Sequence, residues 1–96
     1  MIASFRDDET RLIWQGSFSK KIKLPTELHN LARRKLRMIA AALTIDALRI
    51  PPKNYLERLH ADRDGQWSIR INDQWRICFR WQNGSAHDVE ITDYHR

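Results

Sequence analysis

Arg70 and Arg76 are the residues whose type and spacing most directly indicate chemistry. They lie on either side of a short turn, and the strand pairing derived below places them opposite each other on one face of a sheet. Like charges in that arrangement destabilise a sheet by about 0.2 to 1 kcal/mol. Two interpretations remain open. Both side chains are solvated, or they share an external anion, for which phosphate suits the arginine fork best.

The sequence contains three further reactive residue types. Along the third strand, Tyr94 alternates onto the same face of the sheet as the two arginines, so we expect it near them. The sequence fits a second role equally well, in which Tyr94 only packs at the edge of the sheet. Cys78 also falls on the polar face, but it has no local partner and is interpreted as a small packed thiol. The histidines show no HxxxH or CxxC spacing, so no metal site is predicted; they are His29, His60, His87 and His95.

Two alternating segments must position these residues. Trp67, Ile69 and Ile71, and then Trp75, Ile77, Phe79 and Trp81, have the period of strands with one buried face. A three-residue loop centred on Asp73 pairs Ile69 with Ile77, and keeps both apolar sets on one face.

A second loop is predicted before a third strand. A three-residue loop, Asn83-Gly84-Ser85, pairs Phe79 with Val89 and Ile77 with Ile91. The opposite face then carries Arg80 across from Asp88, so Arg80 has a counter-charge while Arg70 and Arg76 have none. The three tryptophans of this region share the buried face, which favours core packing over nucleotide stacking.

The remaining chain supplies one further strand at each side of a helical stretch. Residues 1–5 are predicted to form a strand, and the acidic run 7–9 begins a short helix that Gly16 ends. Pro25 begins the longest helix, which extends to Leu43, and Thr44 caps a brief helix through Leu48. Residues 55–59 form a strand. This order predicts a two-layer α+β fold, with helices on the tryptophan and isoleucine face of an antiparallel sheet.

Composition favours an anionic partner. The 96 residues fit one domain, residues 1–96, whose formal net charge is +5 and whose pI is about 9.9. With Trp, Tyr and His among the arginines, nucleic acid is favoured over a membrane, although a merely soluble basic protein has the same charge. One cysteine and no long apolar segment predict a cytoplasmic protein without a disulfide.

The strings LERLHADRDGQWSIRINDQWRICFRW and DVEITDYH resemble the HigB toxins, which belong to the wider RelE-like family. The resemblance implies a RelE-like fold and a ribosome-dependent endonuclease that cuts messenger RNA in the A site without a metal or other cofactor. It also implies a HigA-like helix-turn-helix antitoxin, ribosome and messenger RNA as partners, and binding of operator DNA only through the antitoxin complex.

The same resemblance assigns site residues. The matching positions for RNA cleavage are Arg76, Asp93, Tyr94 and His95. In a 2'-hydroxyl attack on the phosphate, His95 is expected to be the general acid or base, with Asp93 orienting it or sharing the proton work. Arg76 is expected to bind the scissile phosphate, and Tyr94 to stack on or hydrogen-bond the nucleotide.

The charged loop that precedes the strands is expected to help hold the RNA backbone, through His60 and Arg63 together with Arg70. This loop departs from the family pattern, because His60 and Ala61 stand where a lysine and a glycine are expected, and Arg96 follows the usual terminal histidine. The alternatives are a ParE-type toxin that inhibits DNA gyrase by binding, without need for a terminal histidine, and an RNA-binding module without turnover.

Overall fold

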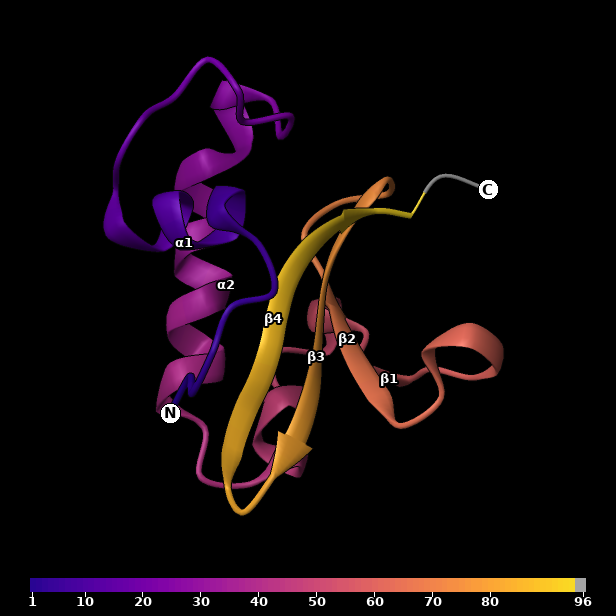
Figure 1. The fold of residues 1–96 in the computed structure, drawn as a ribbon. Helices are drawn as coiled ribbons and strands as arrows, with labels where there is room; N and C mark the ends of the chain where they lie inside the picture. Colours follow the sequence, from indigo (N-terminus) through magenta and orange to yellow (C-terminus); the bar gives the residue numbers. More distant parts are fainter. Residues whose placement is uncertain (95–96) are drawn as a thin grey trace.

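Helices cover one face of a four-stranded antiparallel sheet in the computed structural model, which describes residues 1–94 (Figure 1). The strand order in the sheet follows the chain, β1-β2-β3-β4. The strands are β1 Glu57–Arg58, β2 Gln66–Arg70, β3 Trp75–Gln82 and β4 Ser85–Asp93. The predicted two-layer α+β fold is confirmed.

Two α-helices form the second layer, α1 Asp8–Gln15 and α2 His29–Ala41. Asp7 caps α1, since its side chain accepts a hydrogen bond from the backbone N–H of Thr10 at 2.8 Å, and Gly16 ends the helix with φ 77°. The helix predicted from Pro25 is a 3₁₀ turn, Thr26–Leu28, followed by α2. Three more 3₁₀ turns follow: Ile45–Arg49, Pro52–Asn54 and Ala61–Arg63. Thr44 occupies the N-cap position of Ile45–Arg49, as expected, but its side chain makes no capping hydrogen bond.

The core lies between the helices and the face of the sheet that the alternation predicted to be buried. Ile69, Ile77 and Phe79 from the sheet are fully buried, together with Ile13 of α1 and Leu36 of α2. The three sheet tryptophans are partly buried and pack against this core, as expected; they are Trp67, Trp75 and Trp81. The opposite face is therefore the one available for a site. None of the helices within residues 1–94 is both long and apolar enough to cross a membrane.

The strand register follows the prediction at the first turn and departs from it at the second. Ile69 pairs with Ile77, and Arg70 lies opposite Arg76, as expected. The second loop, however, is a two-residue turn in which Gln82 pairs with Ser85. Its central residues, Asn83-Gly84, both have positive φ, the combination that matches strand twist in a two-residue hairpin.

A β-bulge compensates for the shorter turn. The register shifts between Cys78 and Arg80, and Asp88 has φ 52°, so β4 carries one extra residue at this point. The expected pairing of Arg80 with Asp88 is therefore wrong in register, because Arg80 lies opposite His87. Phe79 lies at the bulge itself, where Asp88 and Val89 occupy the space opposite one residue of β3. Beyond the bulge, the pairing of Ile77 with Ile91 is as predicted.

Two predicted strands are shorter than expected. Residues 1–5 form only two isolated parallel bridges to β4, Ile2 with Ala86 and Phe5 with Val89. These bridges flank the bulge, which interrupts a continuous ladder along β4, and the Asp88 N–H donates to Ser4 Oγ instead at 2.9 Å. The strand predicted over residues 55–59 is limited to β1, since Tyr55 adopts φ 45° directly after a 3₁₀ turn.

Candidate active site

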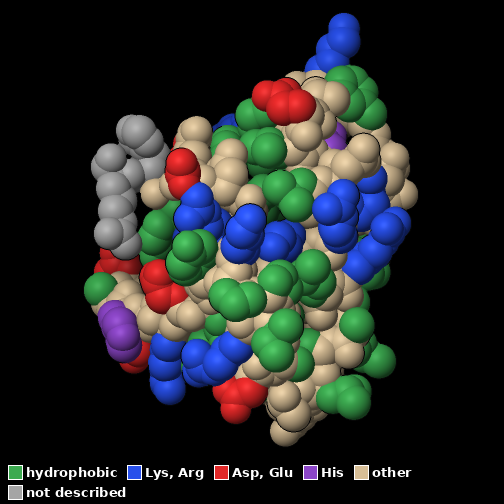
Figure 2. All heavy atoms as spheres, turned by 180° about the vertical axis from the view of Figure 1, so that it is seen from behind, with side chains coloured by type: hydrophobic (Ala, Val, Ile, Leu, Met, Phe, Trp, Pro, Cys, Tyr) green, Lys and Arg blue, Asp and Glu red, His purple; other side chains and the backbone are tan. Residues whose placement is uncertain are grey.

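A cavity of about 420 Å³ opens on the sheet face opposite the helices. We call it the arginine cavity, and its lining residues are Glu57, Arg70, Asn72, Asp73, Gln74, Arg76 and Tyr94. They come from β1, the end of β2, the β2–β3 turn, the start of β3 and the residue after β4. The predicted meeting of Arg70, Arg76 and Tyr94 is therefore confirmed. Figure 2 shows that Lys and Arg side chains gather across one face of the molecule, with hydrophobic side chains between them.

Arg76 is held in place by protein acceptors. Its Nε donates to the buried Ser68 Oγ at 2.7 Å, and its Nη2 donates to the Tyr55 backbone carbonyl at 2.6 Å. Burial lowers the pKa of Arg76 from its usual value, although an arginine remains charged throughout the physiological range. The cavity thus contains a fixed cation whose orientation does not depend on a ligand.

Arg70 has a counter-charge, so the expectation that it has none is wrong. Its Nη2 forms an ion pair with Asp73 in the β2–β3 turn, three residues along the chain. The Arg70 guanidinium carbon also lies 5.1 Å from the centre of the Tyr55 ring. Because the Asp73 side chain is 93% exposed, this ion pair stabilises the fold little, and the guanidinium can exchange its partner for a phosphate.

Tyr94 connects the arginine cavity to a second depression. Its backbone N–H donates to the Gln74 carbonyl at 2.6 Å, which extends the β3–β4 pairing by one residue. The second depression, which we call the loop hollow, has a volume of about 380 Å³. Its lining residues are His60, Ala61, Asp62, Arg63, Thr92, Asp93 and Tyr94. The predicted loop residues His60 and Arg63 therefore share Tyr94 with the two arginines.

Asp93 lies opposite Trp75 at the end of β4 and accepts a hydrogen bond from Gln74 Nε2 at 3.0 Å. It lines the loop hollow and does not line the arginine cavity. His95, the predicted general acid or base, lies outside the described residues.

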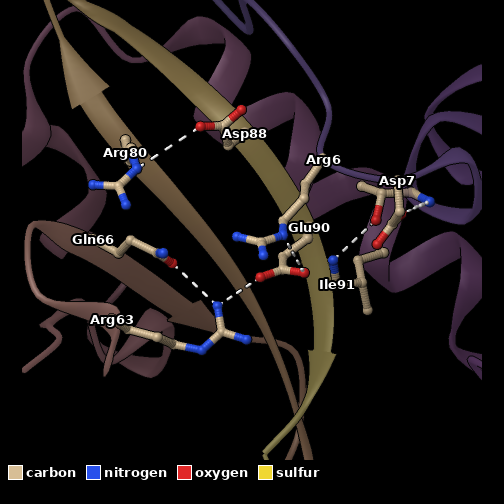
Figure 3. Close-up of polar contacts among 9 residues, drawn as sticks. Arg6, Asp7, Arg63, Gln66, Arg80, Asp88, Glu90 and Ile91 are labelled. Atoms are coloured by element: carbon tan, nitrogen blue, oxygen red, sulfur yellow. Dashed lines mark hydrogen bonds and ion pairs between the residues drawn. The ribbon is translucent and has the colours of Figure 1, made fainter. Parts of the chain in front are cut away.

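Arg63 is engaged inside the protein (Figure 3). Its Nη1 donates to Glu90 Oε1 of β4 at 2.6 Å and to Gln66 Oε1 at 3.1 Å. The hydrogen bond to Glu90 is the main reason that the pKa of Arg63 is raised above its usual value. Arg6 approaches the other oxygen of Glu90 at 3.8 Å. Arg63 therefore links the 3₁₀ turn Ala61–Arg63 to the sheet. The sequence predicted instead that its side chain contacts the RNA backbone.

Two smaller expectations concern the same face. Arg80 has Asp88 as a counter-charge, as predicted, with 3.8 Å between Nε and Oδ2, although the bulge changes how they come together (Figure 3). Cys78 is fully buried, and burial raises the pKa of its thiol, so it is a packed side chain and not a nucleophile. Within residues 1–94, no group of three or more His, Cys, Asp or Glu side chains could hold a metal ion.

Sequence reasoning missed the partners that fix the arginines. Ser68 and the Tyr55 carbonyl orient Arg76, and Glu90 orients Arg63. The loop's departure from the family pattern also has a structural consequence, because Ala61 adopts φ 57° at the position where a glycine was expected. A side chain in this left-handed region is strained, and glycine is not.

The fold is shared with a solved structure. The structure titled YoeB-YefM complex from Staphylococcus aureus contains a chain that matches with a TM-score of 0.61, over 100% of this chain and 99% of that chain. The identity between the two sequences is 12%, so the likeness shows the fold alone. This chain therefore has the same architecture as the matched chain.

Sequence comparisons define the family more closely. The family described as RelE-like toxin of type II toxin-antitoxin system HigB matches residues 3–95. Toxin HigB-1 of Vibrio cholerae is 41% identical over 86 residues, which are 90% of each chain. Endoribonuclease HigB of Proteus vulgaris is 30% identical over 98 aligned residues, covering 99% of this chain and 100% of the relative. The protein belongs to the HigB-like toxins of type II toxin-antitoxin systems, and the resemblance found in the sequence is confirmed.

Proposed function

We propose that the protein is an endoribonuclease that cuts messenger RNA in the ribosomal A site and so inhibits translation. The observation that carries this proposal is the arginine cavity, where Arg70, Arg76 and Tyr94 meet on the uncovered face of the sheet. The Proteus vulgaris relative, which aligns over the whole chain, is named an endoribonuclease. Its name supports the reaction type for this chain.

The proposed reaction is attack of the 2'-hydroxyl on the adjacent phosphate, without a metal. Arg76 binds the scissile phosphate and stabilises the negative charge of the phosphorane, the electrostatic contribution that is often the largest one in catalysis. Its Nε and Nη2 are already fixed by Ser68 and Tyr55, while Nη1 has no acceptor among residues 1–94 and can donate to the phosphate. No reorganisation of the guanidinium is then needed when the RNA arrives.

The remaining site residues are given roles according to the depression that they line. Tyr94 stacks on or hydrogen-bonds the nucleotide at the boundary of the arginine cavity and the loop hollow. His95 and Asp93 carry the proton transfers, and Arg70 and His60 hold the RNA backbone. Arg63 acts through Glu90 as the anchor of the loop, so we assign it to positioning His60 rather than to phosphate binding.

The proposed partners are those of a type II system. A HigA-like helix-turn-helix antitoxin neutralises the toxin in the cytoplasm, and operator DNA is bound only by the toxin-antitoxin complex. The family description supports an antitoxin partner, and the Staphylococcus aureus neighbour was solved in a complex.

Primer extension on ribosomes that carry a defined message tests the reaction. The wild type is expected to produce cuts within the A-site codon, whereas Arg76→Ala and His95→Ala are expected to produce none. Arg37→Ala, on the exposed side of α2, removes one positive charge away from the cavity and should cut like the wild type. Intact message with the wild type, together with inhibition of gyrase supercoiling, would instead place the chain with the ParE-type toxins. Binding to the message without cleavage would identify an RNA-binding module.

A further inference from the structure

A third depression lies beside the arginine cavity, and Tyr94 is not among its lining residues. It has a volume of about 440 Å³, and we call it the Lys53 hollow. Its lining residues are Leu31, Lys35, Lys53, Tyr55, Arg70, Ile71 and Asn72. Arg70 and Asn72 line both this hollow and the arginine cavity, so the two depressions adjoin at these residues. A polymer that extends from one depression into the other would therefore pass Arg70 and Asn72.

The Lys53 hollow differs from the arginine cavity in its charge. The arginine cavity contains two carboxylates, Glu57 and Asp73, beside its two arginines. The Lys53 hollow is lined by three cations, Lys35, Lys53 and Arg70, and by no carboxylate. This imbalance favours an external anion.

Lys35 is only 7% exposed, so a nearby anion would stabilise its positive charge more than that of an exposed lysine. Its ammonium donates one hydrogen bond, to Asn54 Oδ1 at 2.5 Å, and within residues 1–94 neither Lys35 nor Lys53 forms an ion pair. Burial, reinforced by the charge of Arg34, lowers the pKa of Lys35 from 10.5. A buried ammonium without a counter-ion is costly, and a bound anion would offset that cost.

An aromatic ring lies beside these cations. Tyr55 is 57% exposed, and its backbone N–H donates to the Pro52 carbonyl at 3.0 Å. The same tyrosine contacts Arg70 through its ring and Arg76 through its carbonyl. An exposed aromatic ring bordered by cations is the arrangement that proteins use to stack a base and hold the adjoining phosphate of single-stranded RNA.

We propose that the Lys53 hollow binds the nucleotide that neighbours the cleaved phosphodiester, with its base against Tyr55 and its phosphate between Lys35, Lys53 and Arg70. This inference rests on the proposed function, which it extends to a second substrate position. An acidic segment of the antitoxin could also supply an anion. The shared Arg70 and the exposed aromatic ring favour the RNA strand, because they link the hollow to the proposed cleavage site and offer a surface for a base.

Binding of a short RNA that cannot be cleaved tests the proposal. A fluorescent oligonucleotide with 2'-O-methyl groups blocks the attack, and fluorescence anisotropy gives its affinity across a range of KCl concentrations. Each phosphate contact contributes about 0.7 to the slope of log affinity against log salt for a single strand. Lys53→Ala is expected to reduce the slope by about 0.7. Lys20→Ala, which removes an exposed lysine from the 17–23 loop, should leave the slope unchanged.

Tyr55 variants test the stacking separately. Tyr55→Ala is expected to lower the affinity for the RNA by about 5-fold or more, the effect of losing one stacked base. Tyr55→Phe should bind the RNA with the affinity of the wild type. Both variants keep the backbone carbonyl that accepts from Arg76. On the ribosome, Lys53→Ala should raise KM and leave kcat unchanged, because the contact lies outside the bond that breaks.

The results separate the two proposals. If the wild type cleaves with dependence on Arg76, but Lys53→Ala and Lys20→Ala have the same salt slope and Tyr55→Ala binds normally, the Lys53 hollow is not a nucleotide site. If Lys53→Ala weakens only the antitoxin complex, the hollow binds antitoxin and the RNA assignment is overturned. Absence of cleavage by the wild type would refute the proposed function itself.

Discussion

The ion pair between Arg63 and Glu90 should contribute measurably to folding stability. The two side chains are 29% and 14% exposed, and 2.6 Å separates Nη1 from Oε1. A hydrogen bond between charged groups at low exposure is worth about 1.5 to 3 kcal/mol. Glu90→Ala should therefore lower the free energy of unfolding by roughly 2 kcal/mol, or the melting temperature by about 8 to 16 °C in a chain of this size.

Urea denaturation of the wild type, Glu90→Ala, Arg63→Ala and the double variant isolates the pair. The cycle should yield a coupling energy of about 1.5 kcal/mol or more. The matched control is the ion pair of Asp46 and Arg49, whose side chains are 77% and 59% exposed and whose coupling should be below about 0.5 kcal/mol. A coupling for Arg63 and Glu90 as small as in the control would refute the reasoning. So would full cleavage activity in Glu90→Ala together with none in Arg63→Ala, since Arg63 would then act on RNA directly.

Three further predictions concern Lys35, Ala61 and Cys78. Because the pKa of Lys35 is lowered from 10.5 in the folded state, the unfolded chain binds more protons between the two pKa values, and the contribution of Lys35 to stability rises with pH. The stability of the wild type relative to Lys35→Met should thus increase from pH 7 to pH 10 in thermal melts, and parallel curves would contradict this. Ala61→Gly should raise the free energy of unfolding by about 0.5 to 1 kcal/mol in urea titrations, since φ 57° suits glycine; a loss of stability would show that the backbone is not strained. The buried Cys78 should resist iodoacetamide in the native protein, with unchanged cleavage, and rapid alkylation with inactivation would restore it as a reactive thiol.

The alternation of apolar residues was enough to predict the buried face of the sheet and the first turn. A one-residue slip between β2 and β3 would have moved Ile69 or Ile77 out of the core, so the pattern allowed one register. The same pattern could not distinguish a three-residue second loop from a two-residue turn followed by a bulge at Asp88. Both bring Ile77 opposite Ile91, and the two differences of one residue cancel. For that reason Tyr94 was placed on the correct face although the turn was wrong.

Most of the residues that bind the arginine side chains could not be predicted from the sequence. Asp73, the ion-pair partner of Arg70, is not a cross-strand neighbour, so strand pairing alone does not predict it. An aspartate three residues after an arginine, in a turn, does indicate such an ion pair. Glu90 lies 27 residues from Arg63, and no local pattern joins them. Arg76 donates to the backbone carbonyl of Tyr55, and the direction of that carbonyl depends on the left-handed conformation of Tyr55. A pattern of side-chain types does not predict a backbone acceptor.

The central claim is that Arg76 stabilises the transition state of messenger RNA cleavage. Its most direct test is the single-turnover rate of A-site cleavage on programmed ribosomes saturated with toxin, where binding differences no longer contribute. Removal of one such preorganised donor lowers the rate constant by about 10²- to 10³-fold. Arg76→Ala is predicted to fall by that factor while keeping a cooperative thermal transition, and Arg37→Ala to retain the wild-type rate. A rate for folded Arg76→Ala within a few fold of the wild type would contradict the account.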